Sequence, residues 1–256
     1  MSAAMRSKKI EKQRLDILLV ERGLAESRQK AQALILAGAV RVDGKPRDKA
    51  GAAFPASAHI EIADSGLRYA SRGGTKLEGA LQDFGVNVVG KTCLDVGAST
   101  GGFTDCLLQH GAQRVYAVDV TASQLAWKLQ TDPRVAQLEK NARNLRPDDV
   151  AERAELVTID VSFISVVKIL PAVVSCARED AEFLILVKPQ FELDRGDVGK
   201  GGIVREPALR ERAVERVRVA AVAAGLQVAG IVPSRLPGAE GNQEFFLYAR
   251  GPSGAG

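Results

Sequence analysis

The sequence predicts an α/β fold, a mostly parallel seven-stranded sheet covered by helices on both faces, preceded by a small α+β domain. From about residue 73 onward, short apolar runs alternate with amphipathic segments, a pattern typical of a parallel sheet. Residues 14–62 instead combine two short helical patterns with short β elements. A stretch without periodicity, residues 63–71, lies between the two parts, and we interpret it as a linker.

The small first domain should open with two helices. Leu15, Leu18 and Leu19 fall on one face of a helix that starts at Arg14, and Gly23 is expected to end it. The second helix should cover Arg28–Ala37. Ser27 lies at its capping position and Gly38 follows it.

Short strands should follow these helices. Val40 and Val42 alternate as in a strand, and Asp43-Gly44 is a strong signal for a tight turn. His59–Ile62 is predicted to form another strand. A unit of this size is only marginally stable alone but is plausible as an appended domain.

In the larger part, the last two strands have no helix between them, so the final strand is expected to enter the sheet antiparallel. The predicted elements are Gly73–Phe84, Thr92–Val96, Gly102–His110, Arg114–Val118, Ser123–Leu129, Leu156–Ile159, Val166–Cys176, Glu182–Val187, Glu206–Ala224, Val228–Val232 and Glu244–Ala249.

Composition excludes several classes of protein. No window reaches roughly 18 uninterrupted apolar residues, so a membrane-spanning helix is not expected. The basic N-terminus is not followed by an apolar segment, which argues against a secretory signal. Three scattered cysteines favour a reduced, cytoplasmic protein over a disulfide framework. No metal is expected, because the two histidines, His59 and His110, are far apart in the sequence.

The excess positive charge lies at the start of the chain. Residues 1–49 hold 12 Lys and Arg against 6 Asp and Glu, whereas the whole chain has 35 against 31. A basic block of this kind can neutralise nucleic-acid phosphates. The alternative is a solvated helix face beside a basic tail, residues 1–13.

The run R-L-D-I-L-L-V-E-R-G-L-A-E-S-R-Q-K-A-Q-A-L-I-L-A-G-A-V-R-V-D-G-K, Arg14–Lys45, resembles the S-four type RNA-binding domain. This resemblance implies that residues 14–62 bind RNA, although a domain that kept the fold and lost its ligand would look the same. The side chains it places on the RNA-facing surface are Arg14, Arg28, Lys30, Arg41 and Lys45.

A glycine-rich turn follows the first predicted strand of the larger part, in C-L-D-V-G-A-S-T-G-G-F-T-D (Cys93–Asp105). Its glycines lack the G-x-G-x-x-G spacing of dinucleotide folds, and no Lys-Ser/Thr ends it as in a nucleotide P-loop. Asp95 would suit a cationic amino group, and Asp119, which ends the next strand, could bind both hydroxyls of a ribose. These features favour S-adenosylmethionine. A nicotinamide or flavin cofactor, or a tight turn without a ligand, stays open.

The segment D-V-G-A-S-T-G-G-F-T resembles the cofactor loop of FtsJ-like ribose methyltransferases. The resemblance implies a Rossmann-like methyltransferase fold over residues 72–250, with Asn141 near the adenine. The cofactor-binding residues that we expect are Asp95, Gly97, Ser99, Gly101, Gly102, Phe103, Asp119, Asn141 and Asp160.

Four further residues lie at informative positions: Lys76, Asp160, Lys188 and Glu244. Taken singly, each could be a helix cap or a solvated charge. Together they resemble the Lys-Asp-Lys-Glu tetrad of FtsJ-like RNA 2′-O-methyltransferases. Asp160 and Lys188 each end a predicted parallel strand, at the edge where ligands of open α/β sheets bind.

The chemistry of methyl transfer explains these residue types. A ribose hydroxyl is a poor nucleophile near neutral pH, so the enzyme must align the reacting atoms and remove a proton. A lysine can accept that proton if burial and a neighbouring cation favour its neutral form. We expect Lys188 to be the base, oriented together with Lys76, Asp160 and Glu244.

An S-four type domain joined to an FtsJ-like domain is the architecture of the TlyA family, also called haemolysin A, which the chain resembles from about Arg14 to Arg250. The resemblance implies methylation of the 2′-hydroxyl of cytidine in ribosomal RNA. A membrane-active haemolysin and a non-catalytic RNA-binding protein are the alternatives. The segments that carry the resemblance to the TlyA family are Tyr69–Leu81, Ile159–Ser165, Val187–Glu192, Gly199–Arg205 and Gly241–Phe246. Residues Phe191–Arg205 could form a mobile loop over the substrate or an ordinary surface loop. Residues 251–256 should form a flexible tail.

Overall fold

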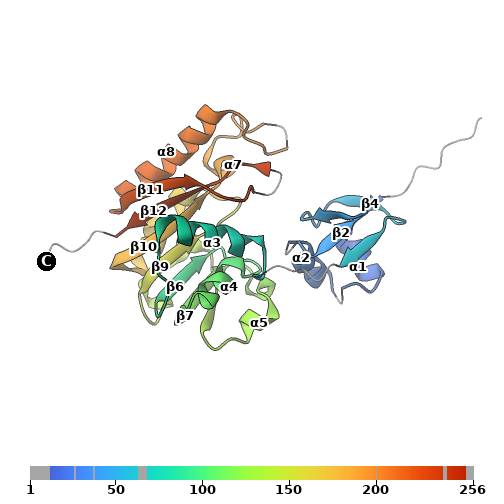
Figure 1. Ribbon diagram of the computed structural model, residues 1–256, viewed down its shortest axis with the longest axis horizontal. Coiled ribbons are helices and arrows are strands. Elements are labelled where there is room, and N and C mark those ends of the chain that lie inside the picture. The colour runs from blue at the N-terminus through green and yellow to red at the C-terminus, as the bar shows by residue number, and fades with distance from the viewer. Residues whose placement is uncertain are drawn as a thin grey trace, which may run out of the picture. The chain divides into compact units, whose positions relative to one another are not determined.

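The structure, a computed structural model, describes residues 12–25, 27–36, 38–62, 68–199, 201–238 and 241–251. The chain divides into two compact units, Met1–Leu67 and Arg68–Gly256 (Figure 1). The expected tails lie outside the described residues, apart from residues 12, 13 and 251.

The expected linker, residues 63–71, differs from the structure at its second half. Residues 63–67 lie outside the described residues, but Tyr69 is buried in the core of the second unit. Ser71 caps the first helix of that unit, because its side chain accepts a hydrogen bond from the Gly73 amide. The second unit therefore starts ahead of residue 72.

The first unit packs two helices against short antiparallel strands. Helices α1 (Leu15–Glu21) and α2 (Arg28–Leu36) pack on each other. Strand β2 (Val40–Val42) pairs with β3 (Lys45–Arg47) and β5 (Ile60–Ile62), and β1 (Lys12–Arg14) pairs with β4 (Ala53–Pro55). The core includes Leu15, Leu18, Leu19, Ala31, Ile35, Val40, Val42 and Ile60.

The turn and cap predictions for this unit are confirmed. Gly23 follows α1 with a positive φ of 68°, and the Ser27 hydroxyl accepts a hydrogen bond from the Lys30 amide at 3.2 Å. Asp43 and Gly44 both have positive φ, as a two-residue hairpin turn requires. Strands β1, β3 and β4 were not predicted, because none of their residues is fully buried and their sequences, KQR, KPR and AFP, show no alternation of apolar and polar residues. Ala37 lies outside the described residues.

The second unit is built on one seven-stranded sheet, as predicted. Its strand order is β11-β12-β10-β9-β6-β7-β8, and β12 is antiparallel to both of its neighbours. The other described pairs are parallel. The strands are β6 (Thr92–Val96), β7 (Arg114–Asp119), β8 (Val135–Glu139), β9 (Ala154–Ile159), β10 (Ala177–Val187), β11 (Gln227–Pro233) and β12 (Phe245–Arg250).

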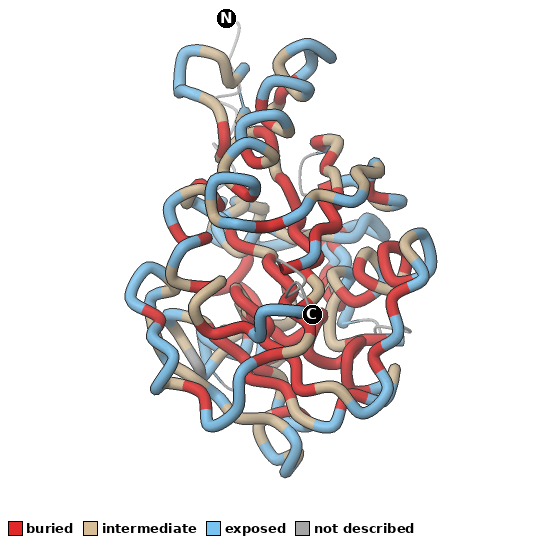
Figure 2. The backbone as a smooth tube through the Cα atoms, turned by 90° about the vertical axis from the view of Figure 1, so that its left-hand side faces the viewer, coloured by how far each residue is buried: buried red, intermediate tan, exposed pale blue. Residues whose placement is uncertain are grey.

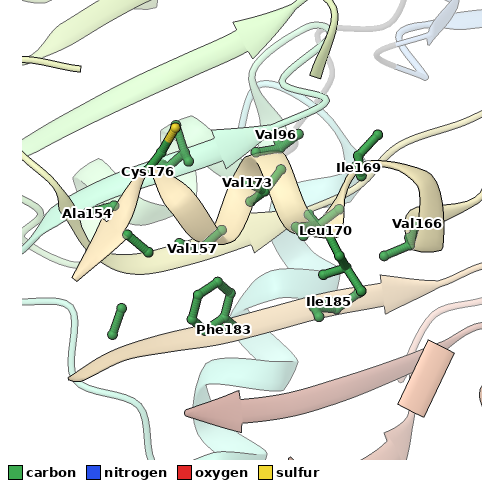
Figure 3. Packing of buried hydrophobic residues seen from close by; sticks show 14 of the residues in the cluster. Val96, Ala154, Val157, Val166, Ile169, Leu170, Val173, Cys176, Phe183 and Ile185 are labelled. Carbon is green, nitrogen blue, oxygen red and sulfur yellow. The ribbon is translucent and has the colours of Figure 1, made fainter. Parts of the chain in front are cut away.

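Successive strand residues point to opposite faces of this sheet, which gives two apolar clusters. Cys93 belongs to the cluster under α3 (Arg72–Phe84) and α4 (Gly102–Gln109), whereas its neighbour Leu94 belongs to the other cluster. Figure 2 shows the buried segments at the centre of the unit and the exposed ones around them. Figure 3 shows Leu170 and Val173 of α6 (Leu170–Ser175) near Val157 on the second face.

The predicted helices are present, but two of them are shorter or broken. Instead of one helix over Ser123–Leu129, a 3₁₀ turn (Ala122–Gln124) precedes α5 (Trp127–Gln130), because Ala126 is extended and its amide bonds to the Thr100 carbonyl. The predicted helix Val166–Cys176 is a 3₁₀ turn (Val166–Lys168) followed by α6, where Pro171 occupies the first turn. The long helix α8 covers Pro207–Ala223.

Segments left unassigned by the sequence also have structure. Helix α7 (Pro189–Glu192) forms where the sequence suggested the start of a loop. Strand β10 starts at Ala177, five residues earlier than predicted, with an irregular register before Glu182.

Candidate active site

The carboxyl edge of the sheet brings the two strand-end residues of the predicted tetrad together. Asp160 follows β9 and Lys188 follows β10, its parallel neighbour. The Lys188 ammonium nitrogen lies 2.6 Å from Asp160 Oδ1 and donates a hydrogen bond to Ser162 Oγ at 3.0 Å. The side chains are 12% and 22% exposed, so this ion pair is largely shielded and yet reachable from solvent. Asp160 Oδ1 accepts no well-directed hydrogen bond from the described residues, so its contact with Lys188 is electrostatic.

A second lysine–carboxylate pair forms at the same edge. Lys76 on α3 donates a hydrogen bond of 2.7 Å to Glu244 Oε2, and the side chains are 11% and 2% exposed. Because β12 runs antiparallel, its first residue, Phe245, pairs with Val187, the last residue of β10. Glu244 and Lys188 are therefore at neighbouring positions of the sheet edge. The four predicted residues form two shielded ion pairs, an arrangement that can orient an amine toward a bound hydroxyl.

The loop after β6 requires glycines because neighbouring segments of the chain pack closely against it. Gly97 and Gly101 have φ near +90°, and a Cβ at Gly97 would come within 2.5 Å of the Asp160 carbonyl oxygen. At Gly101 a Cβ would meet Leu129, and at Gly102 it would meet Ser71 Oγ. Ser99 also has a positive φ, 48°. The glycines thus allow neighbouring segments of the chain to approach. The expected approach of a ligand stays a prediction.

Asp119 and the loop after β6 form a small pocket. The Asp119 carboxylate accepts hydrogen bonds from the Ser99 amide at 2.9 Å and from the Thr121 amide at 3.2 Å. These contacts hold the carboxylate beside the loop, at the end of β7. The pocket is lined by Ala98, Ser99, Ala117, Asp119, Thr121, Leu125 and Gln137.

Asn141 lies close to this pocket along the chain. The Lys140 amide bonds to the Asp119 carbonyl at 2.8 Å, which brings the segment after β8 beside β7. The Asn141 side chain is exposed and caps a 3₁₀ helix (Ala142–Asn144) by accepting a hydrogen bond from the Arg143 amide. An exposed amide next to the end of β7 is compatible with a role at the cofactor, which stays a prediction.

Two side chains of the predicted cofactor residues, those of Asp95 and Phe103, are inside the protein. Phe103 is buried, and its ring stacks on Phe246 with centroids 6.2 Å apart. Asp95 is fully buried, and its carboxylate accepts hydrogen bonds from the Thr104 hydroxyl at 2.7 Å and the Thr158 hydroxyl at 3.0 Å. The structure therefore gives both residues packing partners within the chain, and a direct contact of either with a ligand would require rearrangement.

Burial raises the pKa of Asp95 to about 7, although the hydrogen bonds from Thr104 and Thr158 oppose the shift. Because the folded pKa lies above the unfolded one, this group favours the folded state most at pH below about 4. That contribution is lost as the pH rises toward 7, by up to about 4 kcal/mol for three pKa units. Replacing Asp95 with asparagine removes the ionisation while keeping the shape. The unfolding free energy of Asp95→Asn relative to wild type should therefore rise between pH 4.5 and pH 8, as measured by urea denaturation.

The matched control for this prediction is Asp132→Asn. The Arg134 side chain lowers the pKa of Asp132, so this carboxyl is ionised in the folded state across the pH range and mostly ionised in the unfolded state even at pH 4.5. The control should give a constant difference from wild type. A constant difference for Asp95→Asn as well would show that the buried carboxyl does not titrate as described.

The first unit exposes the five predicted RNA-facing residues, Arg14, Arg28, Lys30, Arg41 and Lys45. Two of them are held by Asp16, a buried acid that sequence reasoning missed. Its carboxylate accepts hydrogen bonds from Arg14 Nε at 3.0 Å and from Arg28 Nε at 2.9 Å. Arg14 Nη2 and Gln32 Nε2 each donate a further hydrogen bond of 2.9 Å, and the Arg14 guanidinium holds the pKa of Asp16 well below its usual range. An acid in the first turn of a helix, at a position facing the core, was the available signal.

A second buried acid that sequence reasoning missed lies near the tetrad. Glu192 at the end of α7 accepts a hydrogen bond from Ser165 Oγ at 2.5 Å and one from the Val166 amide at 2.7 Å. It thus ties the segment after β9, which carries Asp160, to the segment after β10, which carries Lys188. The V-K-P-Q-F-E motif includes Glu192, but nothing in its sequence indicates burial.

The strand order and the residues at the carboxyl edge define a Rossmann-like methyltransferase. Comparison with known proteins gives the family: the model of the FtsJ-like methyltransferases matches residues 69–251, and that of the S4 domain matches residues 13–54. The chain belongs to the FtsJ-like methyltransferase family and carries an S4 domain ahead of it.

Several relatives match nearly the whole length of this chain. The 16S/23S rRNA (cytidine-2'-O)-methyltransferase TlyA of Mycobacterium tuberculosis is 51% identical over 93% of this chain and 89% of the relative. A protein of Brachyspira hyodysenteriae named Hemolysin A is 42% identical over 92% of this chain and 98% of that one. The solved structure of a proposed hemolysin from Streptococcus thermophilus has a TM-score of 0.73 and 41% identity, and covers 95% of this chain and 90% of that one.

Two negative findings concern the described residues alone. None of their helices is both long and apolar enough to cross a membrane. No group of three or more His, Cys, Asp or Glu side chains among them is arranged to hold a metal ion.

Proposed function

We propose that this protein transfers the methyl group of S-adenosylmethionine to the 2′-hydroxyl of a cytidine in ribosomal RNA. The observation that carries the proposal is the pair of shielded lysine–carboxylate contacts, Lys188–Asp160 and Lys76–Glu244, at the sheet edge beside the Asp119 pocket. The name of the M. tuberculosis relative, 51% identical, supports the choice of cytidine in ribosomal RNA.

Different residues of the chain would contact different parts of the cofactor. The Asp119 carboxylate would bind the ribose hydroxyls, beside the pocket formed with the loop after β6. The cofactor supplies a methyl group on a sulfonium, which is already activated for transfer. The backbone of the glycine-rich loop and Asn141 would enclose the rest of it. No contact of the methyl group with a metal ion is needed.

The tetrad would act on the substrate hydroxyl. In its neutral form, Lys188 Nζ accepts the proton of the 2′-hydroxyl while the new oxygen–carbon bond forms and the carbon–sulfur bond breaks. Asp160 and Ser162 orient that amine from two sides. The Lys76–Glu244 pair adds a cation beside the developing charge on the oxygen. The S4 domain would hold the RNA through the cations around Asp16.

The direct test combines methyl-labelled S-adenosylmethionine with purified small and large ribosomal subunits that lack the modification. We expect label on the 2′-oxygen of a cytidine in the RNA of one or both subunits, located by nuclease digestion and mass spectrometry. Label on a base, on another nucleotide or on protein would contradict the proposed reaction. A protein that binds the cofactor but labels neither subunit would contradict the proposed substrate.

A further inference from the structure

A basic hollow lies next to the candidate active site. It is bordered by the segments that follow β9 and β10, and its volume is about 280 Å³, near the lower end for small-ligand sites. Gln190 lies two residues beyond Lys188, and Phe163 directly follows Ser162, which Lys188 contacts. The lining residues that matter for binding are Arg143, Phe163, Lys168, Gln190, Asp194 and Arg216.

Hydrogen bonds and a ring contact hold the lining segments of this hollow in place. The buried Glu192 carboxylate holds Ser165 and the Val166 amide, as described above, and its backbone carbonyl accepts a hydrogen bond of 2.8 Å from Arg216 Nη1. The rings of Phe163 and Phe191 lie 5.4 Å apart at an interplanar angle of 53°. Segments from four places in the chain are therefore already assembled around the hollow, as a binding site requires.

Three cations from different elements converge on it. Arg143 belongs to the 3₁₀ helix after β8, Lys168 to the 3₁₀ helix after β9, and Arg216 to α8. None of the three forms an ion pair with a carboxylate of the described residues, whereas Arg218, two residues along α8, is paired with Glu215. Asp194 is the one carboxylate in the lining, so the cations are in excess. The excess favours an anionic ligand.

A polar atom in the same lining also lacks a partner. Gln190 Oε1 is buried and accepts no hydrogen bond from the described residues. Buried amide oxygens are normally satisfied, so an unpartnered one marks a place where a ligand could donate. A nucleotide carries hydroxyl and amino donors next to its phosphate, so it can satisfy the oxygen and the cations together.

We propose that this hollow binds the RNA phosphodiester adjacent to the target ribose, with Arg143, Lys168 and Arg216 as its cationic contacts. The inference rests on the proposed function. On a ribose, the 2′-hydroxyl and the 3′-phosphodiester are carried by neighbouring carbons. An enzyme that holds the hydroxyl at Lys188 must accommodate that phosphate close by, and the hollow is an adjacent surface that carries cations without a carboxylate partner among the described residues.

The test compares single variants in the full-length protein on unmodified ribosomal subunits. For Lys168→Ala and Arg143→Ala we expect the KM for the subunit to rise about fivefold to tenfold, as for loss of one charged phosphate contact. The value of kcat and the affinity for S-adenosylmethionine should stay within about twofold of wild type. The slope of log Kd for RNA against log salt should become shallower by roughly 0.7 to 0.9 for each cation removed. Lys168→Arg keeps the charge and should restore the KM.

The matched control is Arg218→Ala, which removes an arginine of the same helix whose charge is already paired. If Lys168→Ala and Arg143→Ala behave like this control, the hollow does not bind phosphate. A fall in kcat with an unchanged KM would also overturn the proposal, because it would place these residues in the chemical step. Failure of the proposed function is recognised separately, since the wild-type protein would then label neither subunit.

Discussion

Replacing Lys188 with alanine is expected to slow methyl transfer by about 10²- to 10⁴-fold, the usual contribution of a positioned proton acceptor. Binding of S-adenosylmethionine and of RNA should be retained, because the Asp119 pocket and the cations of the S4 domain do not involve this side chain. Single-turnover rates with saturating RNA, together with separate binding measurements, distinguish the two effects.

The informative control is Lys188→Arg. An arginine keeps a positive charge within reach of Asp160 but stays protonated at all accessible pH values, so it cannot accept a proton. If Lys188 is the base, both variants should be slow. An arginine variant as active as wild type would mean that Lys188 supplies charge alone. An alanine variant near the wild-type rate would remove Lys188 from the reaction, and Lys76→Arg would then test the other lysine of the tetrad.

The positions of the tetrad residues could be predicted because parallel strands end at one edge of a sheet. Asp160 and Lys188 both follow strands that the alternation of apolar residues identified. Which carboxylate contacts which lysine could not be predicted, since that depends on the antiparallel entry of β12 beside β10 and on the position of α3. The sequence therefore predicted which residues lie at the carboxyl edge of the sheet, whereas the register of the strands determines which of them form ion pairs.

Asp95 and Phe103 show what a sequence motif leaves undecided. The motif placed both residues at a ligand site, but the side chain of a strand residue points to one face of the sheet only. Asp95 points to the same face as Cys93, toward α4, where Thr104 meets it. A motif specifies the backbone path at such a loop, whereas the packing of the following helix decides which side chains remain accessible.

The burial of the two acids depends on contacts with other segments of the chain, which no periodicity of the sequence encodes. Glu192 lies on a helix of four residues, too short for an amphipathic pattern to be recognised. Asp16 lies on a helix that the sequence did predict, but the pattern of that helix does not show which donors meet the acid. Each is buried because several donors converge on it from other segments. Such convergence depends on tertiary structure, so a single sequence could not reveal it.

Replacing Asp119 with alanine is expected to weaken S-adenosylmethionine binding about 100-fold. The estimate corresponds to two charge-assisted hydrogen bonds to the ribose hydroxyls, at roughly 1.5 kcal/mol each, with 1.4 kcal/mol per tenfold in affinity. The carboxylate lies at the carboxyl end of β7 and borders the small pocket. Isothermal titration calorimetry with the cofactor, in the absence of RNA, measures this effect without any contribution from catalysis.

The alanine substitution also removes the acceptor of the Ser99 and Thr121 amides, so the loop after β6 could loosen. Asp119→Asn separates the two effects, because its amide oxygen can still accept from the Ser99 amide while the charge is lost. We expect the asparagine variant to unfold at the wild-type temperature and to bind the cofactor about tenfold more weakly, consistent with loss of one charged contact. Unchanged affinity in both variants would exclude Asp119 from the site. Equal losses in both, with the unfolding temperature unchanged, would assign the whole effect to the charge and would contradict the larger loss expected for the alanine variant.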